Sequence, residues 1–412
     1  MKRKHTSFLL AVVVLAVTST AMASTTWYVN GVTGNNSDNC KSPTTACKTI
    51  GHAISLGASG DSIMVAAATY TENLTINKSL KIIGSGASTT IIDGRSFNTV
   101  VTISSTGANV VLSNLTIRNG ENSSGGGVNN SGRLTLNNST VTENLAPLQC
   151  YGFNCLFHGG TASGGGIYNS GTLTISNSII SRNHAGSFCT GPLSCSAFGG
   201  GIYNGGTLMI QNSTLTGNGA DIGCPFGGRS CKVGMGGAVG SGGGTVTLNN
   251  STVEGNKARC SGGCSGTGGA IANGSGNLAM NNSTVSGNPD GGIFNGGTAT
   301  LQNSIVANNS GQDCGGTITS DGYNLSSDST CNLNGPGDMN NTNPNLGPLQ
   351  NNGGPTQTMA LPSGSPAIDA GNPSGCTDGS GHLLKTDQRG KPRPDKEDTG
   401  GCDMGAYERQ SD

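Results

Sequence analysis

The sequence has few charged and few aromatic residues. Only 10% of its 412 residues are Asp, Glu, Lys or Arg, and 4% are Phe, Trp or Tyr. So few aromatic residues beside 71 glycines argue against the packed core of an ordinary α/β globule. The formal net charge of −1 gives no reason to expect nucleic acid or an anionic membrane as a partner.

Long apolar runs are absent beyond the N-terminus. There the basic residues Lys2 to Lys4 precede the apolar run Phe8 to Val17, and Ala21 to Ala23 offers a cleavage site. This order is typical of a secretory signal peptide, which we place at residues 1–23. The run is shorter than the roughly 20 residues that span a membrane. We expect an exported protein, extracellular, on the outer surface or in the periplasm, without a transmembrane segment in its mature chain.

Cysteine, by contrast, is plentiful, with 14 residues. In an exported protein this number predicts disulfides. Near neighbours should pair, although the sequence alone leaves other connectivities open. The predicted pairs are Cys40 with Cys47, Cys150 with Cys155, Cys189 with Cys195, Cys224 with Cys231, Cys260 with Cys264, Cys314 with Cys331, and Cys376 with Cys402. Metal binding is the rival interpretation, but no second Cys or His pair follows at a suitable distance, so neither a metal nor another cofactor is expected.

An internal repeat dominates the middle of the chain. Six segments align without gaps, each preceded by a glycine motif such as Gly164–Ile167. The segments are Leu134–Asn144, Leu173–Asn183, Leu208–Asn218, Val246–Asn256, Leu278–Asn288 and Ala299–Asn309. Their apolar residues alternate with polar ones, as in short strands with one buried face. Since Asn282 and Asn303 lie 21 residues apart, one unit matches one coil of a right-handed parallel β-helix, a solenoid.

Stacked coils should place equivalent side chains in ladders. We predict two apolar ladders in the interior: Ile167, Ile202, Val239, Ile271 and Ile293, and Leu136, Ile175, Ile210, Leu248, Met280 and Leu301. We also predict two asparagine ladders: Asn138, Asn177, Asn212, Asn250, Asn282 and Asn303, and Asn144, Asn183, Asn218, Asn256, Asn288 and Asn309. Because these asparagines recur in every coil, a structural role in turns is favoured over sugar binding or glycosylation.

The longer repeats carry insertions at one place, between the last asparagine and the next glycine motif. These insertions should emerge as disulfide-stapled loops along one edge of the solenoid, which is often the binding face of a repeat protein. They contain aromatic residues that we predict as ligand contacts: Tyr151, Phe153, Phe157, Phe188 and Phe226. Alternatively, these rings pack beneath their own loops.

Both ends of a solenoid need caps. We predict a β-helix over residues 24–343, whose first coil is covered by a short helix at Cys47–Ile54 that carries His52 on its surface. Residues 344–412 should form a C-terminal cap over the last coil. This region holds a charge-dense stretch in which Arg389 should pair with carboxylates. The charged residues are Asp387, Arg389, Arg393, Asp395, Asp403 and Glu408. An ion or ligand site is the alternative interpretation.

Several segments resemble known families. The stretch Thr49–Gly94 resembles the opening coils of pectin-lyase-like right-handed β-helix proteins, and the repeats are similar to those of polymorphic outer-membrane proteins. The C-terminal segments Ser365–Gly371, Thr386–Arg393 and Cys402–Glu408 resemble the end of bacterial choice-of-anchor Q proteins. This resemblance implies an all-β surface protein, and members usually continue into an anchoring segment. Here the sequence ends soon after the motif, which favours a released or non-covalently attached protein.

Pectin-lyase-like proteins often cut acidic polysaccharides, which requires a calcium site with a basic residue, or paired carboxylates. The charged residues of the repeats instead look scattered: Arg133, Glu143, Arg182, Asp221, Glu254, Lys257, Arg259 and Asp290. His158 and His184 should lie in loops without a nucleophile partner. We therefore predict a non-catalytic protein that adheres to a polysaccharide or another cell surface through its loops. A polysaccharide lyase or hydrolase and a passive structural scaffold are the alternatives.

Overall fold

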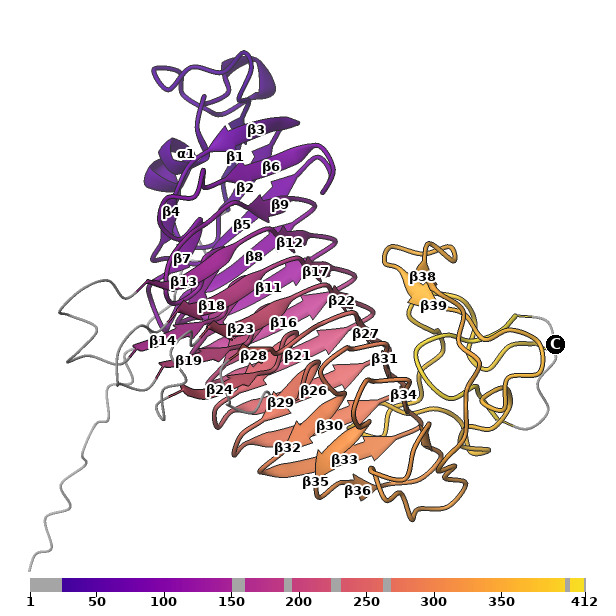
Figure 1. The fold of residues 1–412 in the computed structure, drawn as a ribbon. Helices are drawn as coiled ribbons and strands as arrows, with labels where there is room; N and C mark the ends of the chain where they lie inside the picture. Colours follow the sequence, from indigo (N-terminus) through magenta and orange to yellow (C-terminus); the bar gives the residue numbers. More distant parts are fainter. Residues whose placement is uncertain are drawn as a thin grey trace, which may run out of the picture.

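The computed structural model describes residues 24–149, 160–188, 195–223, 231–261, 268–396 and 401–410. Across these residues the chain winds into a right-handed parallel β-helix (Figure 1). Three long parallel sheets, here called sheets A, B and C, run along it. Because a complete coil gives one strand to each of these sheets, the backbone groups of one coil pair with those of the next.

Sheet A comprises β1 (Thr26–Val29), β2 (Ser62–Val65), β5 (Leu80–Gly84), β8 (Asn109–Ser113), β11 (Arg133–Asn137), β16 (Thr172–Ser176), β21 (Thr207–Gln211), β26 (Thr245–Asn249), β30 (Asn277–Asn281), β33 (Thr298–Gln302) and β36 (Thr319–Ser320). Sheet B comprises β3 (Ala68–Thr71), β6 (Thr90–Asp93), β9 (Thr116–Arg118), β12 (Thr140–Thr142), β17 (Ile179–Ser181), β22 (Thr214–Thr216), β27 (Thr252–Glu254), β31 (Thr284–Ser286), β34 (Ile305–Ala307) and β37 (Leu325–Ser326). Sheet C comprises β4 (Leu74–Ile76), β7 (Val101–Ile103), β10 (Val128–Asn130), β15 (Ile167–Asn169), β20 (Ile202–Asn204), β25 (Val239–Ser241), β29 (Ile271–Asn273), β32 (Ile293–Asn295) and β35 (Cys314–Gly316).

The two predicted apolar ladders fill the interior. In sheet C, Ile167 pairs with Ile202 and Ile202 with Val239, and sheet A pairs Leu136 with Ile175 in the same way. Every member of both ladders is buried. The period-two pattern therefore set both the register and the inward face correctly.

The first asparagine ladder forms the turn between sheets A and B. All six predicted members have positive φ angles, from 46° at Asn250 to 49° at Asn303. This left-handed conformation suits Asn better than most residues. The prediction of a turn role is confirmed.

The second asparagine ladder is a continuous chain of buried amides. Each Nδ2 donates to the Oδ1 of the next coil, for example Asn144 to Asn183 at 2.9 Å and Asn183 to Asn218 at 3.0 Å. The chain ends at Asp313, whose Oδ1 accepts from Asn309 at 3.0 Å. A further set of buried asparagines, which was not predicted, lies at the ends of the sheet C strands. It consists of Asn130, Asn169, Asn204, Asn273 and Asn295.

The predicted N-terminal helix is present as α1 (Ile50–Leu56), after a short 3-10 turn, η1 (Pro43–Thr45). Thr49 caps it by accepting from the His52 amide, and both carboxylate oxygens of Glu72 accept from the amides of Ile50 and Gly51 at 2.8 Å. These bonds satisfy amides that a helix start leaves unpaired. The apolar face of α1, which includes Ile50, covers the first coil, and His52 is partly exposed, as predicted.

The C-terminal region is not the end cap that we predicted. Cys331 and Leu333, which precede it, join the interior cluster at the last coil. Residues 344–396 and 401–410, here called the C-terminal strap, lie alongside sheet B instead (Figure 1). The reason is that β34 carries apolar residues on its outer face as well. Ile305 and Ala307 are covered by Leu361, Ala367 and Met404 of the strap: the whole group is buried. The described part of the strap contains one antiparallel pair, β38 (Leu349–Gln350) and β39 (Thr358–Met359).

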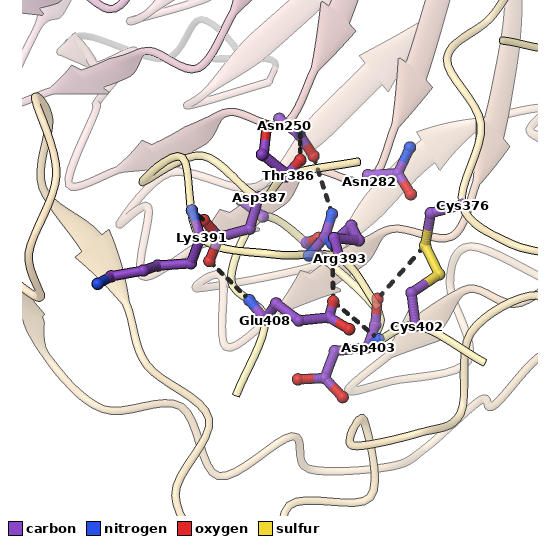
Figure 2. Close-up of polar contacts among 12 residues, drawn as sticks. Asn250, Asn282, Cys376, Thr386, Asp387, Lys391, Arg393, Cys402, Asp403 and Glu408 are labelled. Atoms are coloured by element: carbon purple, nitrogen blue, oxygen red, sulfur yellow. Dashed lines mark hydrogen bonds and ion pairs between the residues drawn. A yellow bond between two sulfur atoms is a disulfide. The ribbon is translucent and has the colours of Figure 1, made fainter. Parts of the chain in front are cut away.

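The strap is attached along the first asparagine ladder. Asn250 donates to the Thr386 carbonyl at 2.8 Å (Figure 2). Asn282 donates to the Thr377 carbonyl at 2.7 Å, and Asn303 to the Asp403 carbonyl at 2.9 Å. These contacts bury the asparagines of the last three repeats, whereas Asn138 stays exposed. One ladder thus makes turns along its whole length and binds the strap in its second half.

The charge-dense stretch holds the strap together internally. Arg389 pairs with Asp387 at 2.7 Å, and Arg393 pairs with Glu408 at 2.7 Å. Arg393 also donates to Oδ1 of Asn250 at 2.8 Å, which links the strap to the solenoid. The predicted pairing of Arg389 with a carboxylate is confirmed. It stabilises the strap internally and does not form part of a cap over the last coil.

Three predicted disulfides are present in the described residues: Cys40–Cys47, Cys314–Cys331 and Cys376–Cys402. Cys195 and Cys260 are disulfide-bonded too.

The other four predicted disulfides lie in the insertions, and none of them can be traced from one cysteine to the other. The predicted pairs are Cys150 with Cys155, Cys189 with Cys195, Cys224 with Cys231, and Cys260 with Cys264. Of these residues, Cys150, Cys155, Cys189, Cys224 and Cys264 fall outside the described ranges. All four pairings, including those predicted for Cys155 and Cys264, therefore stay predictions.

Candidate functional site

The insertions build a second, smaller stack of strands beside the solenoid, here called the side fin. Its outgoing strands are β13 (Leu145–Gln149), β18 (His184–Phe188), β23 (Gly219–Gly223) and β28 (Cys260–Ser261); its returning strands are β14 (Gly160–Ser163), β19 (Cys195–Phe198) and β24 (Cys231–Met235). Both sets are parallel sheets and lie to the left in Figure 1. The insertions share one edge, as predicted, but their described parts are strands and not loops. Successive insertions satisfy each other's backbone groups, which the sequence of one insertion cannot reveal.

Small residues hold the two layers of the side fin together. A buried cluster between them consists of Ala146, Ala162, Ala185, Cys195, Ala197, Ala220, Ile222 and Ala258. Because side chains alternate along a strand, the neighbours of these residues point away from the cluster. The side fin therefore has two outer faces, one on the outgoing layer and one on the returning layer.

The predicted aromatic contacts cannot be placed on either face. Tyr151, Phe153, Phe157 and Phe226 lie outside the described residues, and so does His158. Phe188 is the last residue of β18, and only the backbone of Phe188 is described. Their role in binding stays a prediction.

The outgoing face gathers charged residues that the sequence seemed to scatter. Nε2 of His184 lies 2.7 Å from Oδ2 of Asp221, and Nζ of Lys257 lies 3.3 Å from the same oxygen. These three residues come from three successive coils, brought together by the register of the side fin. The prediction that His184 lies in a loop is therefore wrong, because His184 begins β18. The prediction that Asp221 and Lys257 are scattered is wrong too, because both belong to this cluster.

Two other ion pairs also join charged residues that seemed scattered in the sequence. Arg182 lies 3.0 Å from Glu143, and both side chains are largely exposed. Arg259 lies 3.7 Å from Asp290, and its backbone amide donates to Asp221 at 3.3 Å. Sequence separation conceals these pairs, because partners on adjacent coils are more than 30 residues apart.

The electrostatics of Asp221 favour its charged form. Burial alone would raise the pKa of the Asp221 carboxyl, but the hydrogen bond and charge of His184 and the charge of Lys257 outweigh it. The pKa is therefore lowered. Beside this carboxylate an open cavity of about 570 Å³, here called the charged cleft, is lined by Asp221, Arg259 and Asp290 among others.

The returning face, together with the outer face of sheet C, forms a different cavity. Tyr168 of β15 and Tyr203 of β20 stack with ring centroids 5.2 Å apart, and Phe198 of β19 lies 6.1 Å from Tyr203. A cavity of about 340 Å³, here called the aromatic cleft, opens beside Tyr203. It is lined by Phe198, Tyr203, Met235, Gly240, Ser241, Gly242, Ala272 and Gly274.

These tyrosines are not among the predicted ligand contacts. The predicted aromatic contacts all belong to the insertions, whereas both tyrosines occupy the middle of an Ile-Tyr-Asn strand within the repeat. Since Ile167 and Ile202 point inward, the residues after them must point outward. The same alternation that predicted the core thus contained the signal.

One group of potential metal ligands occurs in the described part of the chain. Ligand atoms of Cys40, Cys47 and His52 lie within 4.8 Å of one another. However, Cys40 and Cys47 are joined in a disulfide, so neither can supply the thiolate that a metal site requires. These residues do not fit a metal ion.

A solved structure has a similar fold. Pectate lyase Pel9A aligns over 94% of this chain and 98% of its own chain, with a TM-score of 0.59 and 15% sequence identity. The protein has a pectin-lyase-like β-helix fold. At this identity the likeness to Pel9A concerns the fold alone. Pectin methylesterase PemA from Erwinia chrysanthemi aligns over 74% of the chain at 14% identity, with a TM-score of 0.37.

Sequence comparisons add no relative. No protein-family model matches it, and no curated protein matches it. The resemblance to choice-of-anchor Q proteins and to outer-membrane-protein repeats therefore stays a prediction. Among the described residues, no helix is long and apolar enough to cross a membrane.

Proposed function

We propose that this protein is an exported, non-catalytic glycan-binding protein that holds its ligand in the aromatic cleft. The observation that carries the proposal is the stacked pair Tyr168 and Tyr203 beside an open cavity bounded by Phe198. Aromatic rings supply large, rigid contact areas and dominate binding hot spots. The insertion-bearing edge thus takes part in binding, together with outward-facing residues of sheet C.

The lining of the aromatic cleft supports binding without catalysis. No Asp, Glu, His, Lys or Arg is among the described residues that line it. General acid–base chemistry needs such a group within hydrogen-bond reach of the reacting atoms. Tyr203 is the one ionisable residue in that lining, and burial raises the pKa of its hydroxyl, so it stays neutral near pH 7.

Export and surface location form part of the proposal. The signal-peptide pattern of residues 1–23 supports it, and so do the disulfides, because disulfides persist in oxidising compartments. The partner would be a polysaccharide of a matrix or of another cell's surface. If the protein binds no polysaccharide, the passive scaffold becomes the better interpretation.

Affinity gel electrophoresis of the mature protein through a panel of soluble polysaccharides tests the proposal. We expect at least one polymer to retard the wild type and to keep its chain length during incubation. The absence of retardation by every polymer would contradict glycan binding. Shortening of a bound polymer would contradict a non-catalytic role.

Polysaccharide cleavage is the second candidate function, and the charged cleft favours it. An ionised Asp221 could accept a proton, while Lys257 and His184, both hydrogen-bonded to that carboxylate, could donate one. Asp221→Asn would remove the base and leave the shape of the cleft unchanged. If the wild type releases reducing ends or unsaturated sugars and this variant does not, cleavage is the function.

A further inference from the structure

We propose that Tyr168 and Tyr203 form an oxidative cross-linking site, at which hydrogen peroxide, acting through a peroxidase, joins the two rings by one carbon–carbon bond. The product is a dityrosine that ties two successive coils of the solenoid together. Its formation needs no glycan ligand, so it is independent of the proposed function. The register of sheet C, the ring geometry and the residues around the pair support it.

The two rings lie in contact because the sheet register aligns them. Tyr168 of β15 pairs directly with Tyr203 of β20. Since neighbouring coils are about 4.8 Å apart, the rings stack, with centroids 5.2 Å apart and planes inclined by 19°. Both residues are partly exposed on the outer face of sheet C. Water can therefore take up the protons that oxidation of these phenols releases.

The stack contains two phenols and no third one. The same outward column carries Asn129 on the coil before Tyr168 and Gly240 on the coil after Tyr203. Phe198, whose ring lies 6.1 Å from that of Tyr203, has no hydroxyl and cannot form a phenoxyl radical. Within the described ranges no other two tyrosine rings are in contact. A radical on either tyrosine thus has one phenol beside it.

The coupling balances in atoms and electrons. Each phenol loses one electron and one proton and becomes a phenoxyl radical. The two radicals combine through ring carbons next to the hydroxyls, and the hydrogen atoms on these carbons then move to the oxygens, which restores both phenols. The two hydrogen atoms removed in total reduce one molecule of hydrogen peroxide to two molecules of water.

The surroundings of the pair favour coupling and give the bond a structural effect. A thiol would return a hydrogen atom to the radical, but no cysteine in the described part of the chain is free. The segment between the two tyrosines contains β18 and β19 of the side fin. A bond across the base of this segment would restrict the unfolded chain as a disulfide does, and so stabilise the fold.

Treatment of the mature protein with hydrogen peroxide and a haem peroxidase tests the proposal. We expect dityrosine fluorescence in protein that still migrates as a monomer on a denaturing gel. Mass spectrometry of a digest should find one peptide pair, joined at Tyr168 and Tyr203 and lighter by two hydrogen atoms than the separate peptides. Absence of fluorescence, fluorescence only in dimers or larger species, or a cross-link at other tyrosines would overturn the assignment.

Matched phenylalanine variants test the pair itself. Tyr168→Phe and Tyr203→Phe keep the ring stack but remove one phenol, so each should abolish the fluorescence of the monomer. Tyr28→Phe, at a partly exposed position of β1, is the control and should leave it unchanged. Fluorescence that persists in the monomer of either stack variant would overturn the pair as the site.

Thermal unfolding tests the tie between coils. The cross-linked wild type should unfold at a higher temperature than the untreated protein, because the bond restricts its unfolded chain. Tyr203→Phe, treated in the same way, should show no such rise. Equal midpoints for the cross-linked and untreated wild type would contradict a bond that ties two coils.

Discussion

At the scale of single residues, asparagine performs separate tasks that its spacing in the sequence does not distinguish. Asn138 and its equivalents adopt positive φ angles at a turn. Asn218 and its equivalents instead make a buried chain of amides. The Oδ1 of Asn218 accepts from the side chain of Asn183, and its Nδ2 donates to Asn256 and to the Ile180 carbonyl. Every polar atom of that side chain thus has a partner, as burial requires.

Removing one amide from this chain should be costly. Asn218→Ala leaves the buried backbone amide and the buried Nδ2 of Asn183 without the acceptor that they share, at roughly 1–3 kcal/mol for each unsatisfied donor. We expect the free energy of unfolding to fall by at least about 2 kcal/mol, measured by urea denaturation. Asn277→Ala, at an exposed outward position of β30, is the control and should change it by less than about 0.5 kcal/mol. Equal effects of both substitutions would contradict a structural amide chain.

At the scale of elements, no strand of the solenoid is stable alone. The strands of sheet C span three residues each. Their inward apolar side chains form a buried ladder only because coils lie above and below them. Stability is therefore shared between neighbouring coils, as in other repeat proteins. The side fin follows the same rule with a thinner core of alanines. Its layers depend on the register of the solenoid that carries them.

A charge in the interior ladder tests this dependence. Ile202→Asp would place a carboxylate between Ile167 and Val239 without a partner, at a cost of several kcal/mol. We expect the midpoint of thermal unfolding, followed by circular dichroism, to shift down by at least about 4 °C. Thr207→Asp introduces the same charge at an exposed position of the same coil and should shift the midpoint by less than about 1 °C. An unchanged midpoint for Ile202→Asp would mean that the register is wrong.

At the scale of the whole molecule, the C-terminal strap ties several coils together. It is bonded to Asn250, Asn282 and Asn303 of successive repeats and is closed by Cys376–Cys402. Inside it, Glu408 is fully buried beside Arg393. Burial raises the pKa of the Glu408 carboxyl to about 8, which the charge of Arg393 only partly offsets, and Asp403 raises it further. Folding thus binds a proton at this group.

This shift gives the protein a pH dependence of defined sign. Because the pKa of Glu408 is higher in the folded state than its usual value of 4.5, its contribution to stability is complete below pH 4.5 and is lost as the pH rises through about 8. The unfolding midpoint of the wild type should therefore fall between about pH 6 and pH 9 by a few degrees more than that of Glu408→Gln. The comparison concerns slopes, since the substitution also alters the group that accepts a hydrogen bond from Arg393. Parallel pH profiles for the two proteins would contradict the shift.

The sequence by itself determined the solenoid. Alternation of apolar and polar residues, together with a regular repeat, specifies which side chains point inward, and stacking then fixes the register at residues such as Ile202 and Leu248. It also predicted the capping helix at Ile50, the ladder turns at Asn250, and the pairing of Cys314 with Cys331. Each of these features depends on neighbours in the chain or on the repeat period, both of which can be read from one sequence.

Tertiary structure alone decided the candidate sites and the path of the strap. His184, Asp221 and Lys257 meet only because successive insertions stack. Likewise, the strap lies against sheet B because β34 is apolar on both faces. In each case the interacting residues are more than 30 positions apart in the sequence. Their proximity depends on the lengths and pairing of the insertions between them, which no local pattern encodes.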